Sequence, residues 1–141
     1  MKAISWILVL LGSLVAQESP KITAKHIDVS GYPAVARQAQ LQGTISMRLT
    51  ISSTGEVTDA TANTNSPLLV QHPLLQHELL RMARRWTFQC LGCRTSEVYE
   101  HTLIFVYKLE GKGNPNPDRG TVSFDLPNTV TVRASKPMPQ P

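Results

Sequence analysis

The chain has 141 residues, a formal net charge of +4 at pH 7, 41% hydrophobic residues and 17% charged residues. This length predicts a single domain, and this balance is typical of a chain that folds around a core. The positive charge is spread too thinly for a nucleic-acid binder, which usually carries a basic stripe with interleaved aromatic residues. The one dense basic cluster, Arg81, Arg84 and Arg85, is expected to be a solvated helix face near a C-terminus.

The N-terminus has the pattern of a secretory signal peptide. Lys2 precedes a short apolar run that ends at Ala16, and polar residues follow directly. A charged start, a short apolar stretch and a small final residue are the parts of a signal peptide, and a spanning helix would need about 20 apolar residues. We therefore assign residues 1–16 to a signal peptide and expect an exported chain without membrane insertion. The alternative is an uncleaved N-terminal anchor in the inner membrane.

The first half of the domain contains one helix and two strands. Residues 17–30 are a lead-in, read as an extended arm, an edge strand or a linker, and the domain itself covers residues 31–110. Pro33 suits the first turn of a helix, which Gly43 is expected to end. Residues 44–51 then alternate between apolar and polar side chains, which predicts a strand with one buried face.

The second strand follows a turn at Gly55, where a positive φ is expected. It covers residues 56–63, and its apolar parity shifts between Val57 and Ala60, which predicts a bulge or an early end. A second helix opens at Pro73. Its apolar stripe, at helical spacing, consists of Leu75, Leu79, Met82, Ala83 and Trp86.

The third strand is predicted at residues 97–109, and its middle is apolar on both faces. Residues 111–120 are rich in Gly, Pro and Asn and indicate a linker. Residues 121–133 predict an additional strand or hairpin, which Pro127 would confine to an edge. Residues 134–141 are expected to be a disordered tail.

This order of elements predicts an α+β fold, with two helices packed on a small three-stranded antiparallel sheet and an optional C-terminal hairpin. At this point the sequence resembles the C-terminal domain of TonB-type energy transducers. The resemblance covers about residues 31–109 and is carried by the order and spacing of its motifs. The motif residues are Tyr32, Pro33 and Ala36 at the start, Gly43, Gly55 and Val57 around the strands, and Trp86 and Phe88 at the helix end.

The resemblance implies a periplasmic domain that takes part in transmembrane transport. Such a domain binds an extended peptide of an outer-membrane transporter, or of another envelope protein, by adding it as a strand to its sheet. The third strand is the expected binding edge, at His101, Thr102, Leu103, Ile104, Phe105, Val106 and Tyr107. The alternative is a structural or self-associating envelope protein, such as a homodimer, whose edge is filled by its own tail or by a second copy.

Cys90 and Cys93 form a C-x-x-C motif, and an even cysteine count in an exported chain favours a disulfide. A redox-active pair, as in a thiol oxidoreductase, a metal site and free thiols are the alternatives. The four histidines are scattered, and none lies at a diagnostic spacing from a nucleophile or carboxylate. We therefore expect no catalytic residue, no bound metal and no cofactor. Trp86 and Phe88 are expected in the core, where aromatic side chains dominate small domains.

Overall fold

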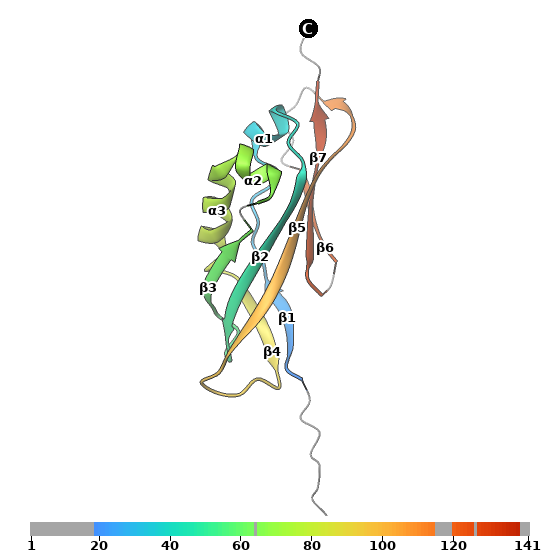
Figure 1. Cartoon of the computed structure of the whole chain (residues 1–141). Coiled ribbons are helices and arrows are strands. Elements are labelled where there is room, and N and C mark those ends of the chain that lie inside the picture. Colours follow the sequence, from blue (N-terminus) through green and yellow to red (C-terminus); the bar gives the residue numbers. More distant parts are fainter. Residues whose placement is uncertain (1–18, 64, 115–119, 126, 139–141) are drawn as a thin grey trace, which may run out of the picture.

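The structure is a computed structural model that describes residues 19–63, 65–114, 120–125 and 127–138. Within these residues it contains three helices and seven strands (Figure 1). The helices are α1 (Ala34–Gln38), α2 (Pro67–Gln71) and α3 (Pro73–Ala83). The strands are β1 (Lys21–His26), β2 (Gly43–Ser52), β3 (Val57–Ala62), β4 (Thr87–Leu91), β5 (Val98–Asn114), β6 (Thr121–Asp125) and β7 (Thr129–Pro137).

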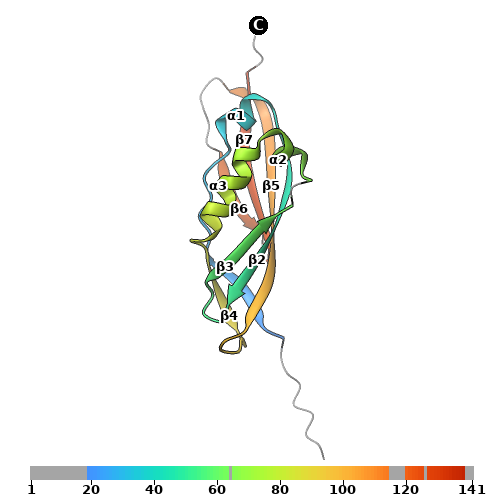
Figure 2. The same cartoon turned by 60° about the vertical axis from the view of Figure 1, so that its left-hand side comes forward.

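The strands form two sheets. The larger sheet has the order β3-β2-β5-β7-β6, and the smaller sheet pairs β1 with β4. All pairs are antiparallel except β5 with β7, which run parallel. The helices gather at one end of the elongated molecule and the β1–β4 ribbon lies toward the other (Figure 1). In the view of Figure 2 the helices lie in front of β5 and β7, so they cover one face of the larger sheet.

The strand β2 is flanked on both sides and supplies the centre of the core. Ile45, Met47, Leu49 and Ile51 are all 0% exposed, which confirms the alternation expected for this strand. The predicted bulge is present in β3, where the register with β2 shifts between Thr50 and Ile51.

Gly55 is required by both its backbone angle and its surroundings. Its φ is 89°, and an added Cβ would lie 1.8 Å from the carbonyl oxygen of Phe88. The N–H of Phe88 also donates to the Gly55 carbonyl at 2.8 Å. The turn between β2 and β3 is thus fastened directly to β4, which only a residue without a side chain allows.

Two helix predictions need correction. Gly43 does not end the first helix; it is the first residue of β2, and α1 stops at Gln38. The chain leaves α1 through Gln40, whose φ of 54° takes the left-handed conformation that glycine usually takes at this place. The helix α2 was not predicted, because Pro67 closes a run of turn-forming residues and the helix behind it is only five residues long.

The prediction of a three-stranded sheet with two helices is also wrong in number. β6 and β7 form the predicted hairpin. β7 extends to Pro137 and pairs with β5. The prediction of a disordered tail is therefore wrong for residues 134–137. β5 likewise continues to Asn114 into the expected linker. The lead-in contains β1, paired with β4. The assigned signal peptide lies outside the described residues, and within them no helix is long and apolar enough to cross a membrane.

The core extends through the C-terminal hairpin. Val130 and Val132 of β7 are 1% and 0% exposed and belong to the same buried cluster as Trp86 and Phe88. Trp86 stacks on Phe105, with ring centroids 5.5 Å apart. The prediction that Trp86 and Phe88 are core residues is therefore confirmed.

A buried arginine fastens β7 to the first helix. Arg37 of α1 is 5% exposed, and its Nε donates to the carbonyl oxygen of Ser135 at 2.7 Å. One of its terminal nitrogens donates to the carbonyl oxygen of Lys136 at 3.2 Å. Because these acceptors are backbone carbonyls near the end of β7, the last strand is held at both its core face and its C-terminal end.

Candidate functional site

The two sides of β5 are occupied to different lengths. One side pairs with β2 from Val98 to Tyr107. The other side pairs with β7 only from Ile104 onward, where Ile104 lies opposite Thr129. The seven predicted edge residues therefore divide into residues 104–107, which already have a strand partner, and residues 101–103, which have none on that side within the described chain. We define residues 98–103 on this side as the open edge.

The open edge presents backbone groups that can accept a strand. The N–H of Ile104 donates to the Asn128 carbonyl oxygen at 2.8 Å, so Ile104 directs its backbone groups toward β7. Successive residues of a strand alternate in this direction. Val98, Glu100 and Thr102 therefore direct their N–H and C=O groups to the side that no described strand occupies. All three are exposed, Val98 to 63%.

The opposite set of β5 side chains points into the core. Leu103, Phe105 and Tyr107 are 2%, 0% and 1% exposed. The Tyr107 ring meets the Tyr32 ring edge-on, with centroids 5.5 Å apart, and burial raises the pKa of both phenols, that of Tyr32 to about 12. The side chain of Tyr107, one of the seven predicted edge residues, is thus inaccessible to a partner in this fold.

His101 is the histidine of the open edge, and its side chain lies on the core side of β5. Its ring packs against Phe88, with centroids 5.4 Å apart, and its Nε2 is buried without a hydrogen-bond partner in the described part of the chain. Burial lowers the pKa of His101 below its usual 6.5 because the charged imidazolium would lose its hydration. The folded protein therefore favours neutral His101.

This lowered pKa predicts that acid destabilises the fold. A histidine whose folded pKa is depressed contributes stability that is present above its unfolded pKa and lost as the pH falls below it. The free energy of unfolding should therefore decrease between about pH 7 and about pH 5. Denaturant unfolding at both pH values tests this, with His101→Gln as the comparison. An equal decrease in the two proteins would assign the effect to other groups.

A hollow lies between the β1 region and β6, near the point where the open edge meets β7. Ala24 and Ile27 from the β1 region and Phe124 of β6 line a pocket of about 260 Å³, with Lys25 and His26 at its side. The same three apolar residues also line a smaller space with Leu103, Asn128 and Val130. Phe124 is 48% exposed. The hollow is large enough to hold one apolar side chain of a bound molecule.

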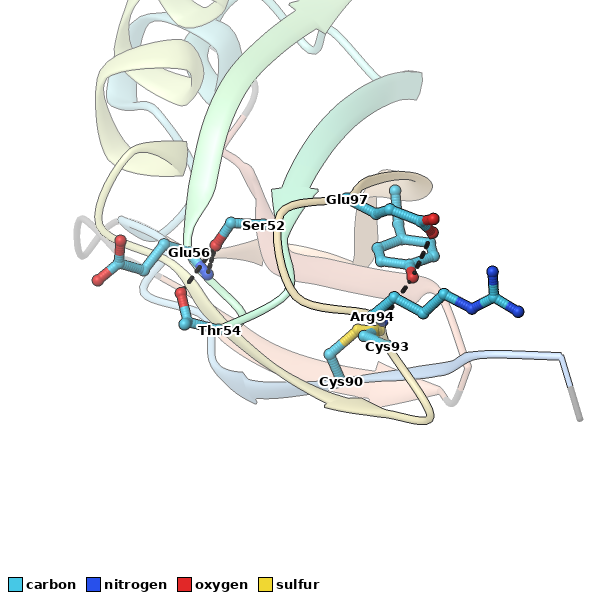
Figure 3. The surroundings of a disulfide bond; sticks show 8 residues. Ser52, Thr54, Glu56, Cys90, Cys93, Arg94 and Glu97 are labelled. Atoms are coloured by element: carbon cyan, nitrogen blue, oxygen red, sulfur yellow. Dashed lines mark hydrogen bonds between the residues drawn. A yellow bond between two sulfur atoms is a disulfide. The ribbon is translucent and has the colours of Figure 1, made fainter.

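The other end of the open edge is held by a disulfide and a small hydrogen-bond network (Figure 3). Cys90 and Cys93 are joined, with Cα atoms 5.7 Å apart, in agreement with the predicted disulfide. The N–H of Arg94 donates to the Tyr99 hydroxyl at 2.8 Å, and that hydroxyl donates to a Glu97 carboxylate oxygen at 3.1 Å. These contacts order the loop that leads into Val98.

Reducing the disulfide should loosen this loop while leaving the core intact. The bond closes a loop of only a few residues, so its loss should lower the free energy of unfolding by about 2 kcal/mol. We expect faster amide hydrogen exchange in β4 and in residues 92–99 and unchanged exchange in β2. The Cys90→Ser/Cys93→Ser variant should behave like the reduced protein, and uniform exchange changes across both sheets would contradict a local role.

Several parts of this region were not evident from the sequence. The pairing of β7 with β5 and the position of Phe124 beside β1 depend on contacts between distant segments. The sequence predicted a strand or hairpin at residues 121–133 but did not indicate its partner strand. No group of three or more His, Cys, Asp or Glu side chains able to hold a metal ion occurs among the described residues.

Comparisons with known proteins identify a family over the central part of the chain. A family model described as the Gram-negative bacterial TonB protein C-terminal matches residues 29–109, more than half of the chain. The solution NMR structure of the Pseudomonas aeruginosa TonB CTD matches with a TM-score of 0.46 and 22% sequence identity, covering 64% of this chain and 89% of that chain. A search of curated proteins finds no match.

Proposed function

Because the chain belongs to the TonB C-terminal family, whose domains are periplasmic and interact with outer-membrane transporters, we propose that it is an exported periplasmic protein that binds an extended peptide. The peptide belongs to an outer-membrane transporter or another envelope protein and adds as a strand at the open edge, beside His101, Thr102 and Leu103. The family is non-enzymatic and linked to TonB-dependent transport.

The observation that carries this proposal is the half-occupied side of β5. From Ile104 on, this side already pairs with a parallel strand of the same chain. The six residues before Ile104 continue the same strand without a partner on that side among the described residues. A peptide strand added there would extend the line of β7, and its main-chain hydrogen bonds would give affinity with little dependence on sequence.

Sequence preference would come from the hollow between the β1 region and Phe124, which adjoins the narrow space lined by Leu103 and Asn128. A peptide that runs along the open edge toward Asn128 reaches the hollow lined by Ala24, Ile27 and Phe124. An aliphatic or aromatic side chain that fills it removes apolar surface from water, worth about 1.5–3 kcal/mol when burial is complete. We therefore expect peptides with one large apolar residue near the end that approaches Asn128 to bind most tightly.

Titration of the ¹⁵N-labelled protein with peptides from the N-termini of outer-membrane transporters tests the proposal. The largest amide shifts should occur at Val98, Glu100 and Thr102, with smaller shifts at Phe124. Shifts confined to β3, which forms the opposite edge of the larger sheet, would place binding elsewhere. If no peptide shifts the open edge at any concentration, strand addition at this edge is wrong.

A matched chemical control separates strand addition from nonspecific contact. Methylation of a peptide nitrogen removes one N–H donor without changing the side chains. Two peptides methylated at neighbouring residues differ only in whether the lost donor faces β5 or solvent. We expect a large loss of affinity for one peptide and little change for the other. Equal losses would contradict a paired strand.

A second candidate function is favoured by β7 itself. This strand pairs with residues 104–110 of β5, which include residues 104–107 of the predicted edge, and it is held there by its buried valines and the Arg37 contacts. A domain closed in this way could serve as a structural or self-associating envelope protein, pairing copies through remaining edges. Sedimentation equilibrium distinguishes self-association from peptide binding. Reversible dimerisation that added peptides do not change favours the self-associating protein. A protein that stays monomeric at all concentrations and binds peptides favours strand addition.

A further inference from the structure

The outer face of α3 has an unusual arrangement of charge. The helix buries Leu75, Leu79 and Met82 against the sheet. At 100° per residue, His77, Arg81 and Arg84 lie on the side directly opposite this buried stripe. All three are exposed, and Leu74 and Arg85 flank them on the same side. We call His77, Arg81, Arg84 and Arg85 the α3 basic face.

Among the described residues, no carboxylate forms an ion pair with the α3 basic face. Glu78 is the single acidic residue of α3, and it accepts a hydrogen bond from Ser30 at 3.0 Å on the flank of the helix. The ion pair found among the described residues, Arg133 with Glu110, lies in the β5–β7 region. The three arginines therefore present a formal charge of +3 over about 6 Å of helix rise without an ion-pair partner in the described chain.

Two exposed aliphatic side chains precede these cations in the chain. Leu74 is 74% exposed at the start of α3, and Val70, one turn earlier at the end of α2, is 67% exposed. Leu80 is partly buried and lines a shallow open hollow of about 350 Å³ with His77, Arg81 and Arg84. The three arginines thus lie at and just beyond the C-terminal end of α3, while Leu74 projects at its N-terminal end and Val70 projects from α2 before it. Favourable charges at a helix C-terminus explain Arg84 and Arg85 but not the exposed Leu74 and Val70.

We propose that the α3 basic face is a docking surface for an anionic phospholipid membrane, on which the protein lies without inserting a helix. Arginine guanidinium groups match phosphate geometry and are weakly hydrated, so Arg81, Arg84 and Arg85 engage headgroup phosphates. The exposed Leu74 and Val70 supply the aliphatic side chains that enter the acyl boundary. This proposal does not depend on peptide binding at the open edge, which lies on a different part of the fold.

The projecting aliphatic residues favour a membrane over an acidic peptide. Charge pairing with an acidic peptide would engage the arginines but would leave the exposed Leu74 and Val70 side chains in water. A membrane surface can bind both the arginines and the exposed aliphatic side chains. Each Lys or Arg near an anionic bilayer contributes about 1 kcal/mol to the free energy of binding, and buried apolar side chains contribute more. An acidic protein segment is the competing partner that the experiment must separate.

Co-sedimentation with vesicles tests the proposal on the full chain purified after export. Vesicles with about one quarter phosphatidylglycerol in phosphatidylcholine should bind the wild-type protein, and binding should weaken as NaCl rises from about 50 to about 500 mM. Arg81→Glu/Arg84→Glu should reduce partitioning about tenfold or more. Leu74→Ser should reduce it by a smaller factor on the same vesicles.

A charge-matched control uses the opposite face of the sheet. Arg48→Glu/Lys108→Glu changes the net charge equally at two exposed residues and should keep nearly wild-type binding. Circular dichroism verifies the fold of each variant. Equal losses in both charge-reversal variants, or equal binding to vesicles of pure phosphatidylcholine, would overturn the proposal. If the wild type ignores vesicles but binds a hexaglutamate peptide through Arg81 and Arg84, the partner is an acidic protein instead.

Discussion

Replacing Trp86 with alanine is expected to lower the free energy of unfolding by about 3–5 kcal/mol, a large share of the stability of a small domain. Trp86 is 1% exposed and stacks on Phe105 of β5. Its indole Nε1 donates to the Asp28 carbonyl oxygen at 2.8 Å. The side chain therefore connects the end of α3, the central sheet and the segment after β1. Alanine would leave a cavity and an unpaired carbonyl.

Two further variants separate these contributions. Trp86→Phe keeps most of the apolar volume but removes the indole donor, so its loss should be smaller than that of Trp86→Ala. Gln89→Ala, at an exposed site on β4, should change stability by less than about 0.5 kcal/mol. Denaturant unfolding followed by circular dichroism gives all three values. A loss below about 1 kcal/mol for Trp86→Ala would show that this side chain is not central to the core.

The sequence predicted those parts of the fold whose signals are local. The alternation of β2 sets which side chains enter the core, because a strand turns its residues to opposite faces. Gly55 predicted the turn between β2 and β3 because the turn needs a positive φ, which residues with a side chain adopt only with backbone strain. The apolar stripe of α3, from Leu75 to Trp86, predicted both the helix and its buried face.

The parts that the sequence did not predict depend on contacts between distant segments. Nothing in residues 129–137 indicates whether they pair with β5, with another chain or with nothing, because strand propensity does not specify a partner. The parallel pairing also fills part of the edge expected for a peptide. The helix α2 was missed for a different reason: it is too short for periodicity to appear and is held by packing of Leu68 and Leu69.

The replacement Val132→Asp decides whether β7 is a permanent part of the sheet. Val132 is 0% exposed and belongs to the core cluster that includes β2 and α3. A carboxylate placed there would be buried among apolar side chains, so the variant should lose about 4 kcal/mol or more of stability. Because the core is shared, we expect a single unfolding transition at a lower denaturant concentration.

Amide hydrogen exchange shows which elements lose protection in the Val132→Asp variant. If β7 is integral, protection should fall together in β2, α3 and β7, because they open with the same buried cluster. Thr121→Asp introduces the same charge at an exposed residue of β6 and should leave protection unchanged. The contrary result would be lost protection in β6 and β7 alone, with the rest still folded. In that case the hairpin is a detachable cover, and residues 104–107 would become available to a peptide along with the open edge.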